Sequence, residues 1–63
     1  MRATLTRREE EVLALVARGL TNAQVATELD IATRTVGKHL EHVYEKLGTR
    51  TRTGALALWG RGS

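Results

Sequence analysis

The stretch that decides the fold comprises residues 21–48, with the sequence TNAQVATELDIATRTVGKHLEHVYEKLG. Its second half carries apolar residues separated by four, three and four positions: Val36, Leu40, Val43 and Leu47. Successive residues of an α-helix turn by about 100° around its axis, so this spacing forms one apolar stripe. The stretch therefore predicts a short helix over 22–29, a tight turn, and a longer helix over 34–47.

The opposite face of the longer helix is polar and begins with basic residues. It carries Arg34, Lys38, Glu41 and Glu45, with Gly37 and His42 towards its edges. Two basic residues on an exposed helical face are more often solvated surface than ligand contacts. Next to a helix-turn-helix corner, expected here over about residues 21–42, they favour a helix that enters the major groove of DNA.

A further helix is predicted on each side of this pair, over about residues 7–18 and 52–59. The first begins at a capping box, in which the Thr6 hydroxyl and the Glu9 carboxylate each accept from the other residue's amide N–H. Its expected core stripe is Val12, Leu13, Val16 and Ala17, with Leu15 at the flank. It ends at Gly19, which suits the left-handed residue that follows many helices.

Similar signals mark the other helix ends. Thr21 and Gln24 repeat the capping box before the short helix. Thr33 and Thr51 are the expected N-terminal caps of the two helices that follow, and Gly48 is the expected end of the longer one.

The last predicted helix is apolar on more than one side. Leu56 and Trp59 share a face, and Leu58 is displaced from it. Gly54 falls within this helix and weakens it by about 1 kcal/mol relative to alanine. Residues 60–63 are expected to form a frayed tail.

Composition favours one small helical domain. The chain has 63 residues, no cysteine and no proline, and 41% of its residues are hydrophobic. With no disulfide or thiolate metal site, its stability must come from helix packing and helix caps. No long apolar run is present, so we expect no membrane partner. The predicted fold class is all-α, a compact four-helix domain containing a helix-turn-helix.

Charge is distributed unevenly along the chain. Residues 1–32 contain four arginines and five acidic residues, whereas residues 33–63 contain six lysines or arginines and two acidic residues. The basic excess therefore lies on the longer helix and after it. A one-sided positive field suggests a polyanionic partner, and a solvated surface with chance asymmetry is the equally weighted alternative.

The positions that carry a family resemblance span nearly the whole chain. They are Leu5, Thr6, Arg8, Glu9, Glu11, Val12, Leu13, Gly19, Leu20, Thr21, Asn22, Val25, Ala26, Leu29, Ile31, Thr35, Val36, His39, Leu40, Lys46, Leu47, Gly48, Thr51, Arg52 and Ala55. In this pattern the chain resembles the LuxR-type (GerE-like) helix-turn-helix domain of bacterial transcription regulators. The resemblance implies that residues 1–63 are the isolated C-terminal effector domain of a longer regulator.

The resemblance also implies sequence-specific binding of double-stranded DNA, with the helix over 34–47 as the recognition helix. Thr33 and Thr35 match positions that contact phosphates, and Lys46 and Arg52 match basic positions near the DNA backbone. The full set of candidate DNA-binding residues is Thr21, Thr33, Arg34, Thr35, Gly37, Lys38, His39, Glu41, His42, Lys46 and Arg52.

Base readout maps to Gly37, Lys38 and Glu41, and His39 matches a histidine at the edge of the DNA. Here the sequence departs from the family, where the position of Gly37 is commonly lysine or arginine. Glycine offers no side chain to a base. Glu41 is repelled by phosphate unless it accepts a hydrogen bond from a cytosine amino group.

The expected partners follow from the same resemblance. The family's last helix often forms a homodimer, which here assigns Leu56 and Trp59 to the dimer contact, although both are also simple core residues. Two copies would bind an imperfect palindrome, since their recognition helices lie about one DNA turn apart. RNA polymerase is a further candidate partner, no cofactor is expected, and the expected location is the bacterial cytoplasm.

Other functional classes find less support in the residues. His39 and His42 lie close to Glu45, but no cysteine or other strong third ligand accompanies them, so no metal site is expected. No nucleophile is paired with a histidine base, and no glycine-rich phosphate loop is present, so an enzyme is not expected. A helical protein-interaction module, with the last helix as its contact surface, is the remaining alternative.

Overall fold

The computed structural model describes residues 4–62, with side chains described up to Gly60. The helices are α1 (Arg7–Ala17), α2 (Asn22–Leu29), α3 (Thr33–Leu47) and α4 (Arg52–Gly62), and none of the described residues forms a strand. The predicted all-α fold with a helix-turn-helix is therefore confirmed.

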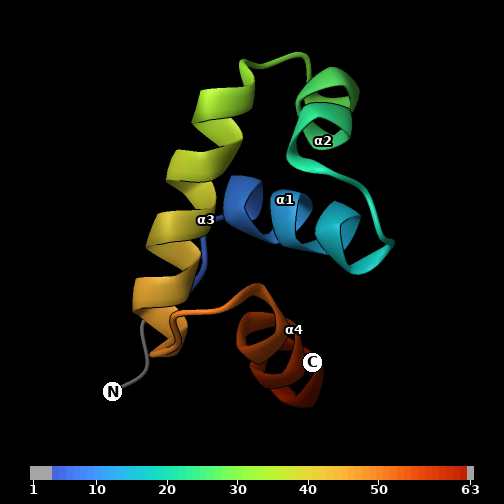
Figure 1. Ribbon diagram of the computed structural model, residues 1–63. Helices are drawn as coiled ribbons and strands as arrows, with labels where there is room; N and C mark the ends of the chain where they lie inside the picture. The colour runs from blue at the N-terminus through green and yellow to red at the C-terminus, as the bar shows by residue number, and fades with distance from the viewer. Residues whose placement is uncertain (1–3, 63) are drawn as a thin grey trace.

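The longest helix, α3, is the element against which the others are arranged. Figure 1 shows α1 lying crosswise beside α3, with α2 on one side of α1 and α4 on the other. α3 packs against α1, α2 and α4. One stripe of α3 therefore meets the rest of the domain, and its other face is left to solvent.

Two clusters of apolar side chains form the core. The first joins α1, α2 and α3 through Val12, Val16, Val25, Ala26, Val36 and Leu40. The second joins α1, α3 and α4 through Leu13, Val43 and Ala55, with Leu47, Leu56 and Trp59 half-buried against it. The predicted stripe of α3 is confirmed, since Val36, Leu40 and Val43 are buried and Leu47 packs beside them.

Ala17 is an exception to the predicted core stripe of α1, because it is exposed. α1 runs away from α3, and its last turn lies beyond the part of α1 that α3 covers (Figure 1). In this last turn of α1, the side that carries Val16 packs against α2. Helical periodicity gives the direction of a residue but not where the neighbouring helix stops.

Both predicted capping boxes form. The Thr6 N–H donates to Glu9 Oε1 at 2.8 Å and the Glu9 N–H to Thr6 Oγ1 at 3.1 Å. Thr21 and Gln24 make the same reciprocal pair at 2.8 and 3.2 Å. Thr51 Oγ1 accepts from the Gly54 N–H at 3.0 Å, so it caps α4 as expected.

The predicted cap at Thr33 is wrong. The N-cap of α3 is Ala32, which makes no side-chain cap, and Thr33 is the first residue of the helix. Asp30 adopts the left-handed conformation, with φ +56° and ψ +48°, and Ala32 is extended. This turn brings the Ala32 carbonyl to the Thr35 and Val36 amides, at 3.0 and 3.3 Å, one residue earlier than the sequence predicts.

The expected frayed tail at residues 60–63 is also wrong over its described part. α4 continues to Gly62 and does not end at Trp59. Glycine has low helix propensity, but once a helix has formed each added residue gains a hydrogen bond at the cost of fixing only its own dihedrals. Ser63 lies outside the described residues.

Candidate nucleic-acid interface

The exposed face of α3 is a continuous polar surface. Arg34, Lys38, Glu41 and His42 are exposed, and Thr35, Gly37 and His39 are half-buried beside them. Lys38 Nζ lies 3.8 Å from Glu41 Oε2, one helical turn away. Both side chains stay open to solvent, at 75% and 65% exposed, so this weak pair leaves both available to a ligand. We call Arg34, Gly37, Lys38, Glu41 and His42 the α3 polar face.

Gly37 makes a notch in this face. A Cβ atom built at Gly37 would meet no atom within 4 Å beyond its own helix and chain neighbours. Packing therefore does not require glycine at this position. The notch lies towards the edge of this face, one helical turn from Glu41, where it allows another molecule to approach the helix backbone closely.

The N-terminus of α3 adds positive character to the same surface. No side chain caps it, and Thr33 and Arg34 in its first turn are exposed. The first amides of a helix carry a partial positive charge and favour anions. This end of α3 can therefore bind a phosphate group through backbone N–H groups, assisted by Arg34.

A second basic region forms where α2 begins. The Arg52 guanidinium, at the start of α4, donates to the Asn22 side-chain oxygen in the first turn of α2. Thr21, the cap of α2, is exposed beside Asn22. The structure therefore brings Thr21 and Arg52 to one place, although 30 residues separate Asn22 from Arg52. Sequence reasoning did not place Asn22 in the site, and its only signal was a polar residue next to a helix cap.

Lys46 lies in a different environment from the other candidate residues. Its Nζ atom donates to Glu9 Oε1 at 2.7 Å and to the Thr4 carbonyl at 3.4 Å. Its side chain is 28% exposed and that of Glu9 only 5%. Lys46 is therefore partly withdrawn from the surface, and its ammonium group forms an ion pair with the buried carboxylate of Glu9.

Glu9 is ionised at neutral pH in this arrangement. Burial alone would raise its pKa, but three interactions outweigh burial and lower the pKa below its ordinary value of 4.5. They are the hydrogen bond from Lys46, the hydrogen bonds from Thr6, and the Coulombic attraction of the Lys46 ammonium group. The pair is thus a charged one at the end of α3 that is remote from Arg34.

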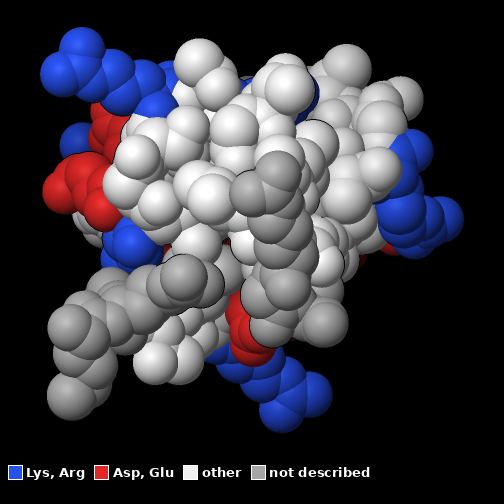
Figure 2. Space-filling view, turned by 90° about the horizontal axis from the view of Figure 1, so that it is seen from below, with Lys and Arg blue, Asp and Glu red and all other residues white. Residues whose placement is uncertain are grey.

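The surface over α4 differs from the polar face of α3. Leu56 and Trp59 are half-buried and pack against the core, whereas Leu58 is 38% exposed. Figure 2 views the molecule from the α4 end, and most of the lysine, arginine and acidic side chains visible there lie around the rim. Apolar contact with another molecule is therefore available mainly through Leu58 rather than through the two predicted dimer residues.

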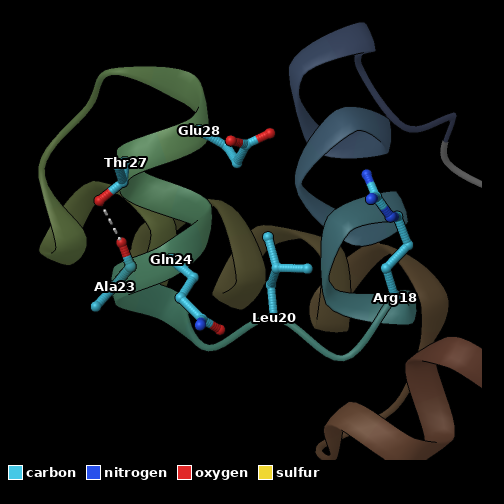
Figure 3. A pocket seen from close by; sticks show the side chains of 6 residues that line it. All are labelled: Arg18, Leu20, Ala23, Gln24, Thr27 and Glu28. Carbon is cyan, nitrogen blue, oxygen red and sulfur yellow. Dashed lines mark hydrogen bonds between the residues drawn. The ribbon is translucent and has the colours of Figure 1, made fainter.

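One hollow in the surface lies between α1 and α2. It is an open groove of about 490 Å³ lined by Arg18, Leu20, Ala23, Gln24, Thr27 and Glu28 (Figure 3). The Thr27 hydroxyl there donates to the Ala23 carbonyl of its own helix at 3.1 Å. None of the candidate DNA-binding residues lines this groove. They lie instead on α3 and at the starts of α2 and α4.

Two negative findings concern the described part of the chain. No group of three or more histidine, cysteine, aspartate or glutamate side chains there is placed to hold a metal ion. No helix among the same residues is long and apolar enough to cross a membrane.

Comparison with known proteins gives consistent matches. Residues 3–59 match the family model described as "Bacterial regulatory proteins, luxR family". The chain is 47% identical over 55 residues to "Probable transcriptional regulatory protein SgaR" of Hyphomicrobium methylovorum, covering 87% of this chain and 26% of that protein. It is 40% identical over 55 residues to "Probable HTH-type transcriptional regulator GfsR" of Streptomyces halstedii, covering 87% of this chain and 23% of that one.

A solved structure shares the fold. The crystal structure of the response regulator ChrA, from a heme-sensing two-component system, matches with a TM-score of 0.91 at 40% identity. The match covers 98% of this chain and 31% of ChrA. The chain thus spans about a quarter of the two curated relatives and less than a third of ChrA.

Proposed function

The chain belongs to the luxR family of bacterial regulatory proteins, and from this membership we propose that α3 lies in the major groove of double-stranded DNA and reads a specific sequence. The resemblance predicted from the sequence is confirmed, and with it the coarser function of DNA-binding transcriptional regulation. The prediction that the chain is not an enzyme is also confirmed, because the family and these relatives are transcriptional regulators.

One observation carries the proposal: α3 has a buried stripe that holds it against every other helix and an opposite face that is exposed and begins with Arg34 and Lys38. The major groove is about 12 Å wide and admits one α-helix with its side chains. A helix held on one side and polar on the other can enter the groove without losing core contacts.

Phosphate contacts would fix the position of the domain on the duplex. We assign them to two helix N-termini: that of α3, with Thr33, Arg34 and Thr35, and that of α2, with Thr21 and Arg52. Backbone amides and arginine side chains at such ends bind phosphates without regard to sequence. Their part in the function is to set the register of α3 in the groove.

Base contacts would come from the α3 polar face. Lys38 can donate to the O6 and N7 atoms of guanine, and Glu41 can accept from the N4 amino group of cytosine. The open notch at Gly37 allows a base edge to approach the helix beside Glu41. His39 and His42 flank this face. A binding site that contains G·C pairs follows from these residue types.

A homodimer through α4 completes the proposal. Its support is the side chain of Leu58, which is a large hydrophobic group exposed on α4. Leu56 and Trp59 would then support the contact from the core side, since they pack beneath it. Two copies would bind an imperfect palindrome, with half-sites about one DNA turn apart.

We further propose that this chain is the C-terminal effector domain of a longer regulator that acts in the bacterial cytoplasm. The proposal of a longer regulator is supported by the small share of each relative's length that the chain spans. RNA polymerase would be the partner through which bound protein affects transcription.

Replacing Lys38 tests the proposal. Lys38→Ala should lower affinity by about 1–3 kcal/mol for the preferred duplex and by less for others, because a base contact distinguishes sequences. The matched control, Arg18→Ala, removes an exposed positive charge from the groove between α1 and α2. It should affect all sequences equally and weakly. A uniform loss with Lys38→Ala would instead make Lys38 a phosphate contact, and no loss would refute its assignment to the interface.

A further inference from the structure

The Lys46 ammonium group joins three parts of the chain at the last turn of α3. It donates to Glu9 Oε1 in the first turn of α1 at 2.7 Å, and to the Thr4 carbonyl in the segment before α1 at 3.4 Å. Glu9 also accepts from the Thr6 N–H in the capping box of α1. Lys46 therefore connects the C-terminal end of α3 to the group that starts α1.

This arrangement makes a phosphate contact costly for Lys46. Two of the three Nζ donors already go to Glu9 and to the Thr4 carbonyl, and the Glu9 side chain is only 5% exposed. A phosphate that drew Nζ away from Glu9 would leave the ionised carboxylate buried without its charged partner, which is strongly unfavourable. Arg34, Lys38 and Arg52 are exposed and carry no such cost.

The pair also lies where it can fix the orientation of α3. The first core cluster holds the N-terminal half of α3 through Val36 and Leu40. At the other end, Val43 lies against Leu13 and Ala55, and Lys46 adds a directional ion pair to α1. Apolar contacts resist separation but allow small rotations, whereas a charge-assisted hydrogen bond has a preferred geometry.

We propose that Lys46 is a positioning residue for DNA recognition: it acts through Glu9 to hold α3 at the angle required by the groove, and it does not contact phosphate. This inference rests on the proposed function, since the angle of α3 matters only if α3 reads DNA. It assigns to Lys46 a different role from the backbone contact implied by sequence resemblance.

One substitution tests the proposal sharply, because the two possible roles of Lys46 predict opposite effects on DNA affinity. Glu9→Gln removes a negative charge, and glutamine still serves in a capping box. If Lys46 contacts phosphate, this substitution frees it and should tighten binding. If Lys46 acts through Glu9, the same substitution loosens α3 and should weaken binding by about tenfold, comparable to the loss of one base contact.

The experiment uses a labelled duplex, selected by the wild-type chain from a random pool, and anisotropy titrations over a salt series. Lys46→Met should also weaken binding by about tenfold, but leave the slope of log K against log salt unchanged. Arg34→Met, the matched loss of an exposed charge on α3, should reduce the magnitude of that slope by about 0.9. Lys46→Arg should restore affinity, and Glu9→Gln with Lys46→Met should be no weaker than either single change.

Tighter binding by Glu9→Gln, or a smaller slope with Lys46→Met, would overturn the inference. Circular dichroism at the titration temperature identifies any variant that is unfolded. If Lys46→Met does not fold, the direction of the Glu9→Gln effect decides alone. Failure of the wild-type chain to bind any duplex at low salt would instead refute the proposed function.

Discussion

The Arg52 guanidinium donates a hydrogen bond to the Asn22 side-chain oxygen and so ties the start of α4 to the start of α2. The Arg52 side chain is exposed, and its guanidinium has further N–H donors that this hydrogen bond does not use. A helix start and an arginine in contact form a stronger anion site than either alone. The same contact links the helix proposed for dimerisation to the helix-turn-helix.

Replacing Arg52 with methionine should therefore remove one phosphate contact. The slope of log K against log salt should fall in magnitude by about 0.9, measured by anisotropy on any duplex that the wild-type chain binds. Asn22→Ala is the control, because it removes the hydrogen-bond acceptor but no charge. Equal slopes for Arg52→Met and the wild type would place Arg52 outside the DNA contact.

The ion pair of Glu9 with Lys46 predicts a loss of stability in acid. The pKa of Glu9 is lower in the folded chain than in the unfolded chain, because Lys46 and Thr6 stabilise its charged form against the opposing effect of burial. The unfolded state therefore binds the proton first as pH falls. The contribution of Glu9 is fully present above about pH 5 and is lost as pH falls through its folded-state pKa.

Urea denaturation at pH 7 and at intervals down to pH 3 measures this effect. The contribution of the pair should be about 1–3 kcal/mol at neutral pH. Glu9→Gln should lower the free energy of unfolding at pH 7 and flatten its dependence on pH in acid. The same acid dependence in Glu9→Gln as in the wild type would show that other carboxylates cause it.

Gly54 predicts an unusual response to alanine. A Cβ atom at this position would lie 2.9 Å from Thr51 Oγ1 and would clash with Thr49 Oγ1. Thr51 Oγ1 caps α4, and Thr49 Oγ1 accepts from the Thr51 N–H at 3.4 Å. Gly54→Ala should therefore destabilise the chain by about 1–2 kcal/mol, although alanine favours helices by about 1 kcal/mol.

Gly60→Ala is the matched control in the same helix. A Cβ atom there would meet nothing within 4 Å. This change should be neutral or stabilising by up to about 1 kcal/mol. Thermal denaturation of both variants distinguishes the cases, and an increase in Tm with Gly54→Ala would contradict the close approach seen at Thr49 and Thr51.

The notch at Gly37 predicts a gain of general affinity. Gly37→Lys places a positive charge on the α3 polar face where a side chain has open space. It should increase the magnitude of the salt slope by about 0.9 and strengthen binding to all duplexes at low salt. Gly37→Ala, which should stabilise the helix by about 1 kcal/mol without added charge, is the control. An unchanged salt slope with Gly37→Lys would mean that this face does not meet DNA.

The exposed side chain of Leu58 predicts a measurable effect on self-association. Leu58→Glu should weaken a dimer formed through α4 by about tenfold or more, because it would bury a charge at the contact. Ala23→Glu, on the exposed side of α2, should have no effect. Sedimentation equilibrium measures both, and a wild-type chain that is monomeric at every concentration, with and without DNA, would reject the dimer.

Local features of this fold could be predicted from sequence because they depend on neighbours in the chain. The boxes at Thr6 and Thr21, and the left-handed glycines at positions 19 and 48, follow from side-chain reach and backbone freedom over a few residues. The position of the turn at Asp30 and Ile31 could be predicted, but the left-handed conformation of Asp30 could not. Aspartate adopts the left-handed conformation less readily than glycine, and its geometry moved the cap of α3 to Ala32.

The long-range contacts of the candidate interface were beyond sequence reasoning. Lys46 and Glu9 are 37 residues apart, and Arg52 and Asn22 are 30 apart. Taken alone, Lys46 and Arg52 each suit a solvated surface or a phosphate contact. Only the packing of α1 and α4 against the helix-turn-helix brings the partners together. Periodicity predicted that Arg34 and Lys38 share an exposed face because both lie on one helix.

Direct DNA binding is the most decisive measurement. A fluorescently labelled duplex is titrated with the chain at a low and at a near-physiological salt concentration, and anisotropy is recorded. The account predicts saturable binding that weakens steeply as salt rises, because phosphate contacts release condensed counterions. Absence of binding even at low salt, or binding that salt leaves unchanged, would contradict it and would favour a protein-interaction module built on α4.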